Sequence, residues 1–146
     1  MQWIYQDIEF TDEMIEEYIG FTYCITNVKT NRKYVGKKGF TRRKTFQKNN
    51  KKKRKLVMSD WKNYYGSSEE LKADIKEFGK DNFRREIIRL CKSKSEMNYY
   101  ELHEQMVRHV MLKPLEYYNS YVGTRINRNQ LNRLLTIDQE PAKVPD

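Results

Sequence analysis

One carboxylate in the second half of the chain has neighbours that restrict what it can do. A helix is predicted over residues 95–112, and at 100° per residue Glu104 falls within an apolar stripe of that helix. Desolvation disfavours a charged carboxylate there, so Glu104 must be paired, protonated or bound to a cation. The alternatives to a cation are a salt bridge to Arg108, four residues further on, or a position at the margin of the stripe. Four apolar residues share the face: Met97, Tyr100, Val107 and Met111.

The positive charge of the chain is concentrated in one segment. No acidic residue lies between Asn27 and Ser59, whereas the rest of the chain holds 15 basic and 20 acidic residues. Such one-sided charge suits a phosphate backbone, because each neutralised phosphate releases condensed counterions. A solvated loop or a localisation signal is the alternative for the run 51–55. The segment contains 14 basic residues: Lys29, Arg32, Lys33, Lys37, Lys38, Arg42, Arg43, Lys44, Lys48, Lys51, Lys52, Lys53, Arg54 and Lys55.

Capping and turn signals predict the elements that must position these residues. Strands are expected at 21–26, 33–37 and 83–91, with a hairpin turn between the first two. Helices are expected at 11–19, between the capping box Ser67–Glu70 and Gly79, and from a cap at Ser93 to about Lys113. The basic stretch 37–55 has little apolar periodicity and is expected to be partly loop.

This order predicts an α/β (α+β) fold with a small, mainly antiparallel three-stranded sheet flanked by helices. We expect an N-terminal extension at 1–20, one domain at 21–120 with a basic insertion at 37–59, and a C-terminal extension at 121–146 whose end has a disordered composition. The two cysteines, Cys24 and Cys91, lie in no metal-binding pattern and are expected to be buried free thiols. No apolar run approaches a membrane span, so a cytoplasmic protein is expected.

The predicted hairpin carries two short motifs, Phe21–Thr22–Tyr23 and Tyr34–Val35–Gly36. They resemble the two motifs that name the GIY-YIG nuclease family, with Phe-Thr where the family has Gly-Ile and Val where it has Ile. The similarity covers residues 21–119. Within the family, the chain resembles small phage or mobile-element nucleases. Further matches follow in the same order: Arg42 or Arg43 for an arginine, 79–83 for the turn into the third strand, Glu104 for a helical metal ligand, and Tyr118–Asn119 for the closing element.

The resemblance implies a metal-dependent endonuclease that hydrolyses phosphodiester bonds in DNA. Tyr23, alone or with Tyr34, would be the general base, which requires a tyrosine pKa lowered from about 10 by nearby cations. Arg42 or Arg43 would hold the scissile phosphate with its planar guanidinium group. Glu104 would ligate Mg2+ or Mn2+, and magnesium commonly takes only one or two protein carboxylates.

The expected partner is double-stranded DNA. A homodimer or a protein partner is an open alternative as a source of specificity, and no membrane association is expected. Gly36 would let the nucleic-acid backbone approach the strand closely, although a bulge glycine is equally compatible. Residues 125–133 mix Arg with Asn and Gln, and could either contact DNA or form a polar helix packed on the domain. The expected nucleic-acid contacts are Gly36, Lys37, Lys38, Lys44, Lys52, Lys53, Arg54, Lys55, Tyr64 and Asn119.

Two other functions compete with cleavage. The departure at Phe21–Thr22 favours a catalytically inactive module that binds nucleic acid on the same fold. The run 51–55 would also suit a basic module that docks on an acidic protein. Cleavage in the presence of a divalent metal separates the nuclease from both.

Overall fold

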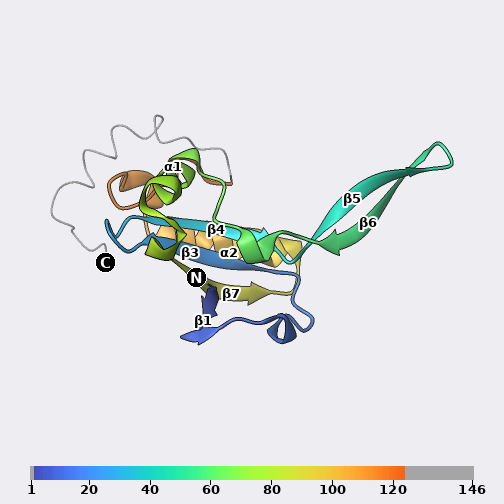
Figure 1. The fold of residues 1–146 in the computed structure, drawn as a ribbon, viewed down its shortest axis with the longest axis horizontal. Helices are drawn as coiled ribbons and strands as arrows, with labels where there is room; N and C mark the ends of the chain where they lie inside the picture. Colours follow the sequence, from blue (N-terminus) through green and yellow to red (C-terminus); the bar gives the residue numbers. More distant parts are fainter. Residues whose placement is uncertain (1, 124–146) are drawn as a thin grey trace.

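The computed structural model describes residues 2–123 and is built on one five-stranded sheet in the order β2-β1-β7-β3-β4 (Figure 1). Three of its strands are the expected ones: β3 (Gly20–Asn27), β4 (Lys33–Gly39) and β7 (Phe83–Cys91). The other two, β1 (Trp3–Tyr5) and β2 (Ile8–Glu9), correct the three-stranded expectation. Strands of three and two residues are too short to produce a periodic pattern in the sequence.

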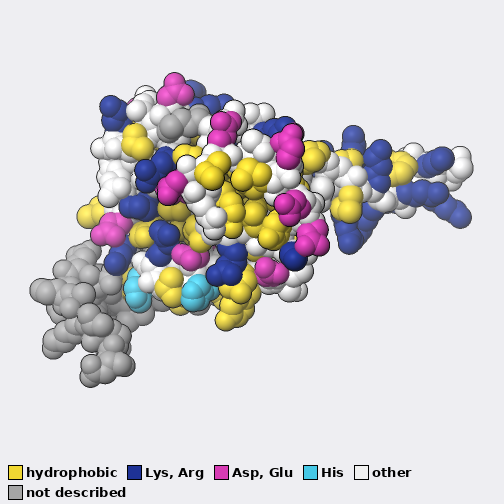
Figure 2. All heavy atoms as spheres, turned by 90° about the horizontal axis from the view of Figure 1, so that it is seen from below, with side chains coloured by type: hydrophobic (Ala, Val, Ile, Leu, Met, Phe, Trp, Pro, Cys, Tyr) yellow, Lys and Arg dark blue, Asp and Glu magenta, His cyan; other side chains and the backbone are white. Residues whose placement is uncertain are grey.

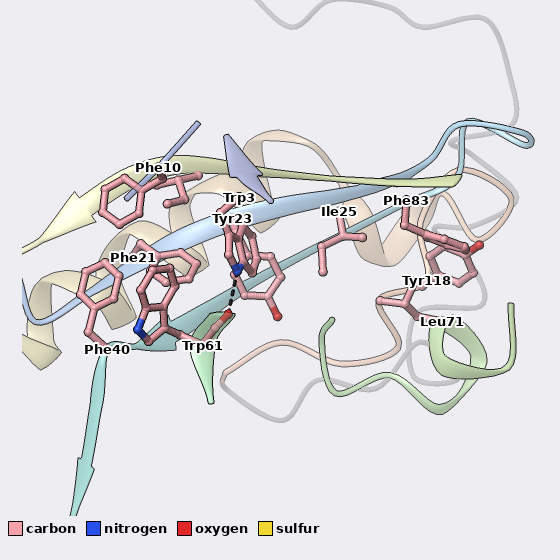
Figure 3. Packing of buried hydrophobic residues seen from close by; sticks show 11 residues of the cluster. Trp3, Phe10, Phe21, Tyr23, Ile25, Phe40, Trp61, Leu71, Phe83 and Tyr118 are labelled. Carbon is pink, nitrogen blue, oxygen red and sulfur yellow. Dashed lines mark hydrogen bonds between the residues drawn. The ribbon is translucent and has the colours of Figure 1, made fainter. Parts of the chain in front are cut away.

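Strand β1 is attached to the sheet through Trp3. It pairs in parallel with β7, and the Trp3 indole Nε1 donates a 2.7 Å hydrogen bond to the backbone oxygen of Trp61. Figure 3 shows this bond within the larger aromatic core, where Trp3 meets Phe21 and Tyr23 edge to face. The N-terminal segment therefore contributes to the core that supports Tyr23.

Antiparallel pairing of β3 with β4 brings the two motif tyrosines together. Tyr23 stands opposite Gly36, and Ile25 stands opposite Tyr34. The connecting turn is closed by the Asn27 side chain, whose oxygen accepts hydrogen bonds from the backbone of residues 29 and 30. Side chains alternate across a sheet, so Tyr23 and Tyr34 face the aromatic core on one side.

Two helices follow the expected capping signals. In α1 (Glu69–Phe78) the Ser68 side chain accepts a hydrogen bond from the Leu71 backbone, and in α2 (Lys94–Val107) Ser93 does the same for Glu96. Helix α2 ends at residue 107 rather than near 113, because His109 adopts a left-handed φ of 55° and a short 3-10 turn follows at Val110–Leu112.

The helix expected at 11–19 is only a 3-10 turn at Asp12–Met14. Glu16 takes a positive φ of 45°, which an α-helix cannot accommodate. This expectation is therefore corrected.

The basic stretch is not loop but a two-stranded ribbon, β5 (Thr41–Lys48) and β6 (Lys51–Met58), that projects from the body of the protein (Figure 1). Asn49 and Asn50 close it with φ values of 54° and 61°, as a tight two-residue hairpin turn requires. Lysine and arginine occupy both faces of the ribbon, so polar and apolar residues do not alternate in its sequence.

Both cysteines are buried and unpaired, as expected. Within residues 2–123, none of the helices is long and apolar enough to span a membrane. The expectations for residues 125–133 and for the end of the C-terminal extension lie outside the described residues.

Candidate active site

A pocket of about 240 Å³ lies at the β4 edge of the sheet and collects both motif tyrosines. It is bounded by the hairpin of β3 and β4 on one side and by α2 on another. The segments at 64–67 and 121–123 also contribute to its wall. The lining residues with polar groups are Tyr23, Tyr34, Lys37, Tyr64, Ser67, Glu101, Gln105 and Tyr121.

The phenol groups of Tyr23 and Tyr34 lie side by side in this pocket. Their ring centroids are 6.2 Å apart, and Tyr64 packs edge-on against Tyr23 at 6.0 Å. The Tyr34 hydroxyl shares a 2.9 Å hydrogen bond with Ser67, whose own segment caps α1. Ser67 was not among the predicted site residues, although it lies in the predicted capping box and close in sequence to Tyr64, which was among them.

Both tyrosines hold their protons more tightly than a free phenol does. Burial raises the pKa of Tyr23 well above its ordinary value, and burial raises the pKa of Tyr34 to about 12. The expectation that nearby cations lower these pKa values is wrong, because desolvation dominates and the charged form of Glu101 also disfavours ionisation of both phenols. At neutral pH both groups are therefore hydroxyls that can donate hydrogen bonds.

The carboxylate that reaches the tyrosines is Glu101 rather than Glu104. Glu101 lines the pocket and acts electrostatically on both Tyr23 and Tyr34. Burial raises the pKa of Glu101, and the neighbouring Lys37 ammonium, 3.6 Å away, opposes that rise.

Glu104 does not line the pocket, which corrects its predicted position. Its Oε2 accepts a 2.9 Å hydrogen bond from Arg108, the salt bridge that was the alternative prediction. The Arg108 guanidinium also contacts the Cys24 sulfur at 3.8 Å, and Cys24 packs in the cluster on the other face of β3 from Tyr23. A shift of three residues along a helix turns a side chain by about 60°, enough to decide which glutamate faces the tyrosines.

Neither Arg42 nor Arg43 lines the pocket, and this too corrects the expected geometry. Both stand on β5, where successive side chains point to opposite faces. Among the residues that the structure describes, the basic residue that lines the pocket is Lys37.

Arg42 nevertheless lies close enough to Asp60 for its charge to act on that carboxylate. The pKa of Asp60 is lowered mainly by its hydrogen bond to Lys38, at 2.7 Å, and also by the charge of Arg42. The Lys38 ammonium in turn lies 4.0 Å from the centre of the Tyr64 ring. Arg42, Asp60 and Lys38 therefore form a series of charged groups between the base of the ribbon and Tyr64 of the pocket wall.

The predicted nucleic-acid contacts divide into three groups. Gly36, Lys37, Lys38 and Tyr64 lie in or beside the pocket, while Lys44 and residues 52–55 are exposed on the ribbon. The expected DNA contact of Asn119 is corrected, because this residue is buried. Its Oδ1 accepts a 3.0 Å hydrogen bond from the Val35 N–H, and its Nδ2 donates a 2.8 Å hydrogen bond to the Val35 carbonyl. Its observed role is to hold the edge strand β4.

The pocket offers oxygen ligands of the kind that magnesium prefers. Among residues 2–123 there is no group of three metal-binding side chains, so Glu101 would be the single carboxylate. Gln105 lies one turn further along α2, lines the same pocket, and has a buried Oε1 without a hydrogen-bond partner. A lone carboxylate beside an unpaired amide oxygen fits a hard ion that retains most of its water.

One comparison with known proteins finds a match. The sequence model of the family described as "Putative endonuclease segE, GIY-YIG domain" matches residues 3–122. No curated protein and no solved structure matches the chain. The family match begins at Trp3 and ends at Val122, and so includes β1 and every described residue of the pocket wall except Gly123.

Proposed function

Because the chain belongs to the GIY-YIG endonuclease family, we propose that it hydrolyses phosphodiester bonds of double-stranded DNA in the pocket between β4 and α2. The observation that carries this proposal is the convergence of Tyr23, Tyr34, Lys37 and Glu101 on one cavity. Hydroxyl donors, an ammonium group and a carboxylate together match the needs of a phosphate and a divalent cation.

Glu101 is the residue that would hold Mg2+ or Mn2+. The ion would lower the pKa of bound water and offset charge on the phosphate. The raised pKa of Glu101 reflects a burial cost that Lys37 offsets only in part, which favours recruitment of a cation. The unpaired Gln105 oxygen supplies a second acceptor in the same pocket.

The tyrosines would orient the substrate rather than remove a proton. Since Tyr23 and Tyr34 stay protonated at neutral pH, each can donate a hydrogen bond to a phosphate oxygen. The Lys37 ammonium would offset the negative charge that grows on the phosphate in the transition state. Arg42 would contact the DNA outside the pocket, where its charge reaches Asp60.

A plasmid-nicking assay with and without Mg2+ tests the site through a matched pair of variants. Glu101→Gln and Glu104→Gln make the same chemical change one turn apart on α2. We expect nicking only with the metal, a loss of at least about a hundredfold in Glu101→Gln, and a change of less than about threefold in Glu104→Gln. The opposite ranking would refute the assignment of Glu101.

A binding module without cleavage is the second candidate function. It is favoured by the absence of both predicted arginines from the pocket lining. Under this alternative the native chain binds DNA but leaves the plasmid intact at every Mg2+ or Mn2+ concentration. Nicking that depends on Glu101 excludes it.

A further inference from the structure

We infer that the β5–β6 ribbon binds duplex DNA through one of its two faces, the face that carries Arg42. The inference deepens the proposed function, on which it rests for the identity of the substrate. Strand register assigns the basic side chains to the two faces, because directly opposed residues of an antiparallel pair share a face. Figure 2 shows the Lys and Arg side chains distributed along the whole projection.

The two faces differ in charge. The Arg42 face has six basic residues: Arg42, Lys44, Lys48, Lys51, Lys53 and Lys55. The Arg43 face has three: Arg43, Lys52 and Arg54. The ribbon therefore concentrates its cations on one side, although the sequence of β6 places five of them in an unbroken run.

The arrangement of the charges on the Arg42 face opposes the stability of the ribbon itself. Lys44 stands directly opposite Lys55, and Lys48 stands directly opposite Lys51, so two like-charged pairs are held close together. Such pairs destabilise a hairpin. On the Arg43 face, Lys52 stands opposite Gln47, and both arginines there also stand opposite neutral residues. A polyanion that lies along the Arg42 face would remove the repulsion, which identifies that face as the binding surface.

The dimensions of the ribbon suit a duplex. From Arg42 to Lys48 the strand extends about 20 Å, roughly the rise of six base pairs. A two-stranded ribbon is also narrow enough to enter the major groove, which is about 12 Å wide. The Arg43 face is a poorer surface for phosphates, because Leu56 and Met58 are 67% and 59% exposed on it.

At the base of the ribbon, charged residues lie between the Arg42 face and Tyr64, which lines the candidate active site. Arg42 is the residue of β5 whose charge reaches Asp60, and Asp60 is bonded to Lys38 beside Tyr64. DNA lying along the Arg42 face would therefore meet Lys38 and then the pocket. Arg43, on the other face, has no place on this route.

Two double variants of the full chain test the face assignment. Lys53→Gln with Lys55→Gln removes two charges from the Arg42 face, and Lys52→Gln with Arg54→Gln removes two from the Arg43 face of the same strand. Binding to a 30-base-pair duplex is measured by fluorescence anisotropy without divalent metal at several salt concentrations. We expect the first variant to lose about tenfold in affinity and the logarithmic salt slope to fall by about 1.8, and the second to lose less than about threefold with little change in slope.

Equal losses in the two variants would overturn the face assignment, as would a greater loss in the second. Tighter binding of the native chain to a single-stranded 30-mer than to the duplex would overturn the duplex assignment. The loss of Lys55 also relieves its repulsion with Lys44, so unfolding of the ribbon cannot account for the weaker binding expected of the first variant. Native melting temperatures in both variants verify the fold.

Nicking of a plasmid by the native chain is scored in parallel. If the native chain does not nick the plasmid but the two double variants still differ in DNA affinity as expected, the proposed cleavage is refuted and the ribbon remains a DNA-binding surface. If nicking depends on Glu101 but the two ribbon variants lose DNA affinity equally, only the inference on the ribbon is refuted. The two failures are thereby distinguished.

Discussion

Gly36 lies directly beneath the phenol group of Tyr23. The two residues are opposite one another in the β3–β4 ladder, and a Cβ atom at residue 36 would lie 2.5 Å from Tyr23 Oη and 2.7 Å from Cζ. The pairing of the two strands is regular here. Residue 36 must therefore lack a side chain for Tyr23 to occupy its position. From the sequence alone, we expected the glycine to allow close approach of nucleic acid or to form a bulge.

Gly36→Ala should displace Tyr23, because any Cβ atom would overlap its hydroxyl group. We expect a destabilisation of about 1–3 kcal/mol, measured as a shift of the urea midpoint, and a loss of nicking of at least about tenfold. Gly123→Ala is the control for stability, since a Cβ there meets no atom within 4 Å. Native stability in Gly36→Ala would contradict this account of the glycine.

Tyr34 should make the protein less stable in alkali. Its pKa is about 12 in the folded chain and about 10 when unfolded, so between these values the folded state holds more protons. The associated stability is complete below pH 10 and is lost as pH rises through 12, in total roughly 2–3 kcal/mol. Urea unfolding from pH 9 to 12 should show a smaller decline in Tyr34→Phe than in the native chain. Tyr99→Phe, which alters a ring that is 67% exposed, should decline like the native chain.

Lys37→Met should change both the rate of nicking and its dependence on pH. The Lys37 ammonium opposes the rise in the pKa of Glu101, so its removal moves that pKa further upward. A cation needs the ionised carboxylate, and the acidic limb of the pH–rate profile should therefore shift to higher pH. Lys92→Gln, a surface residue paired with Glu17, is the control. A lower rate with an unmoved profile would show that Lys37 does not act through Glu101.

Asn119→Ala should loosen the edge strand that carries Tyr34 and Gly36. The Asn119 side chain accepts from the Val35 N–H and donates to the Val35 carbonyl, and Gln105 also donates to that carbonyl. Truncation leaves the buried N–H of Val35 without this acceptor, at a cost of about 1–3 kcal/mol. Hydrogen exchange at the Val35 amide should accelerate more than exchange in β7. Unchanged protection of Val35 would argue against this role.

Lys48→Glu should stabilise the ribbon while it weakens DNA binding. The substitution converts the like-charged pair of residues 48 and 51 into an attractive one, worth about 0.2–1 kcal/mol. Slower amide exchange within β5 and β6, together with weaker duplex binding, is the expected result. Stronger binding would contradict a role of the Arg42 face in holding phosphates.

Local signals in the sequence were sufficient for much of the fold. The serines at 68 and 93 cap α1 and α2 as predicted, and the three principal strands lie where aromatic and β-branched residues indicated them. These features depend on neighbours only a few residues away, which is the range over which capping and periodicity operate. The ribbon was missed because its charge pattern conceals the alternation of its faces.

The amino-acid pattern alone brought together the tyrosines at 23 and 34, since a short hairpin leaves few possible registers. It could not choose between Glu101 and Glu104, because that choice depends on how α2 is rotated against the β4 edge. Nor could it anticipate the pKa of Tyr23, which is governed by burial among rings from distant segments. Contacts between residues far apart in the chain determine how strongly each group is desolvated and which way it points. Such contacts exist only once the chain is folded.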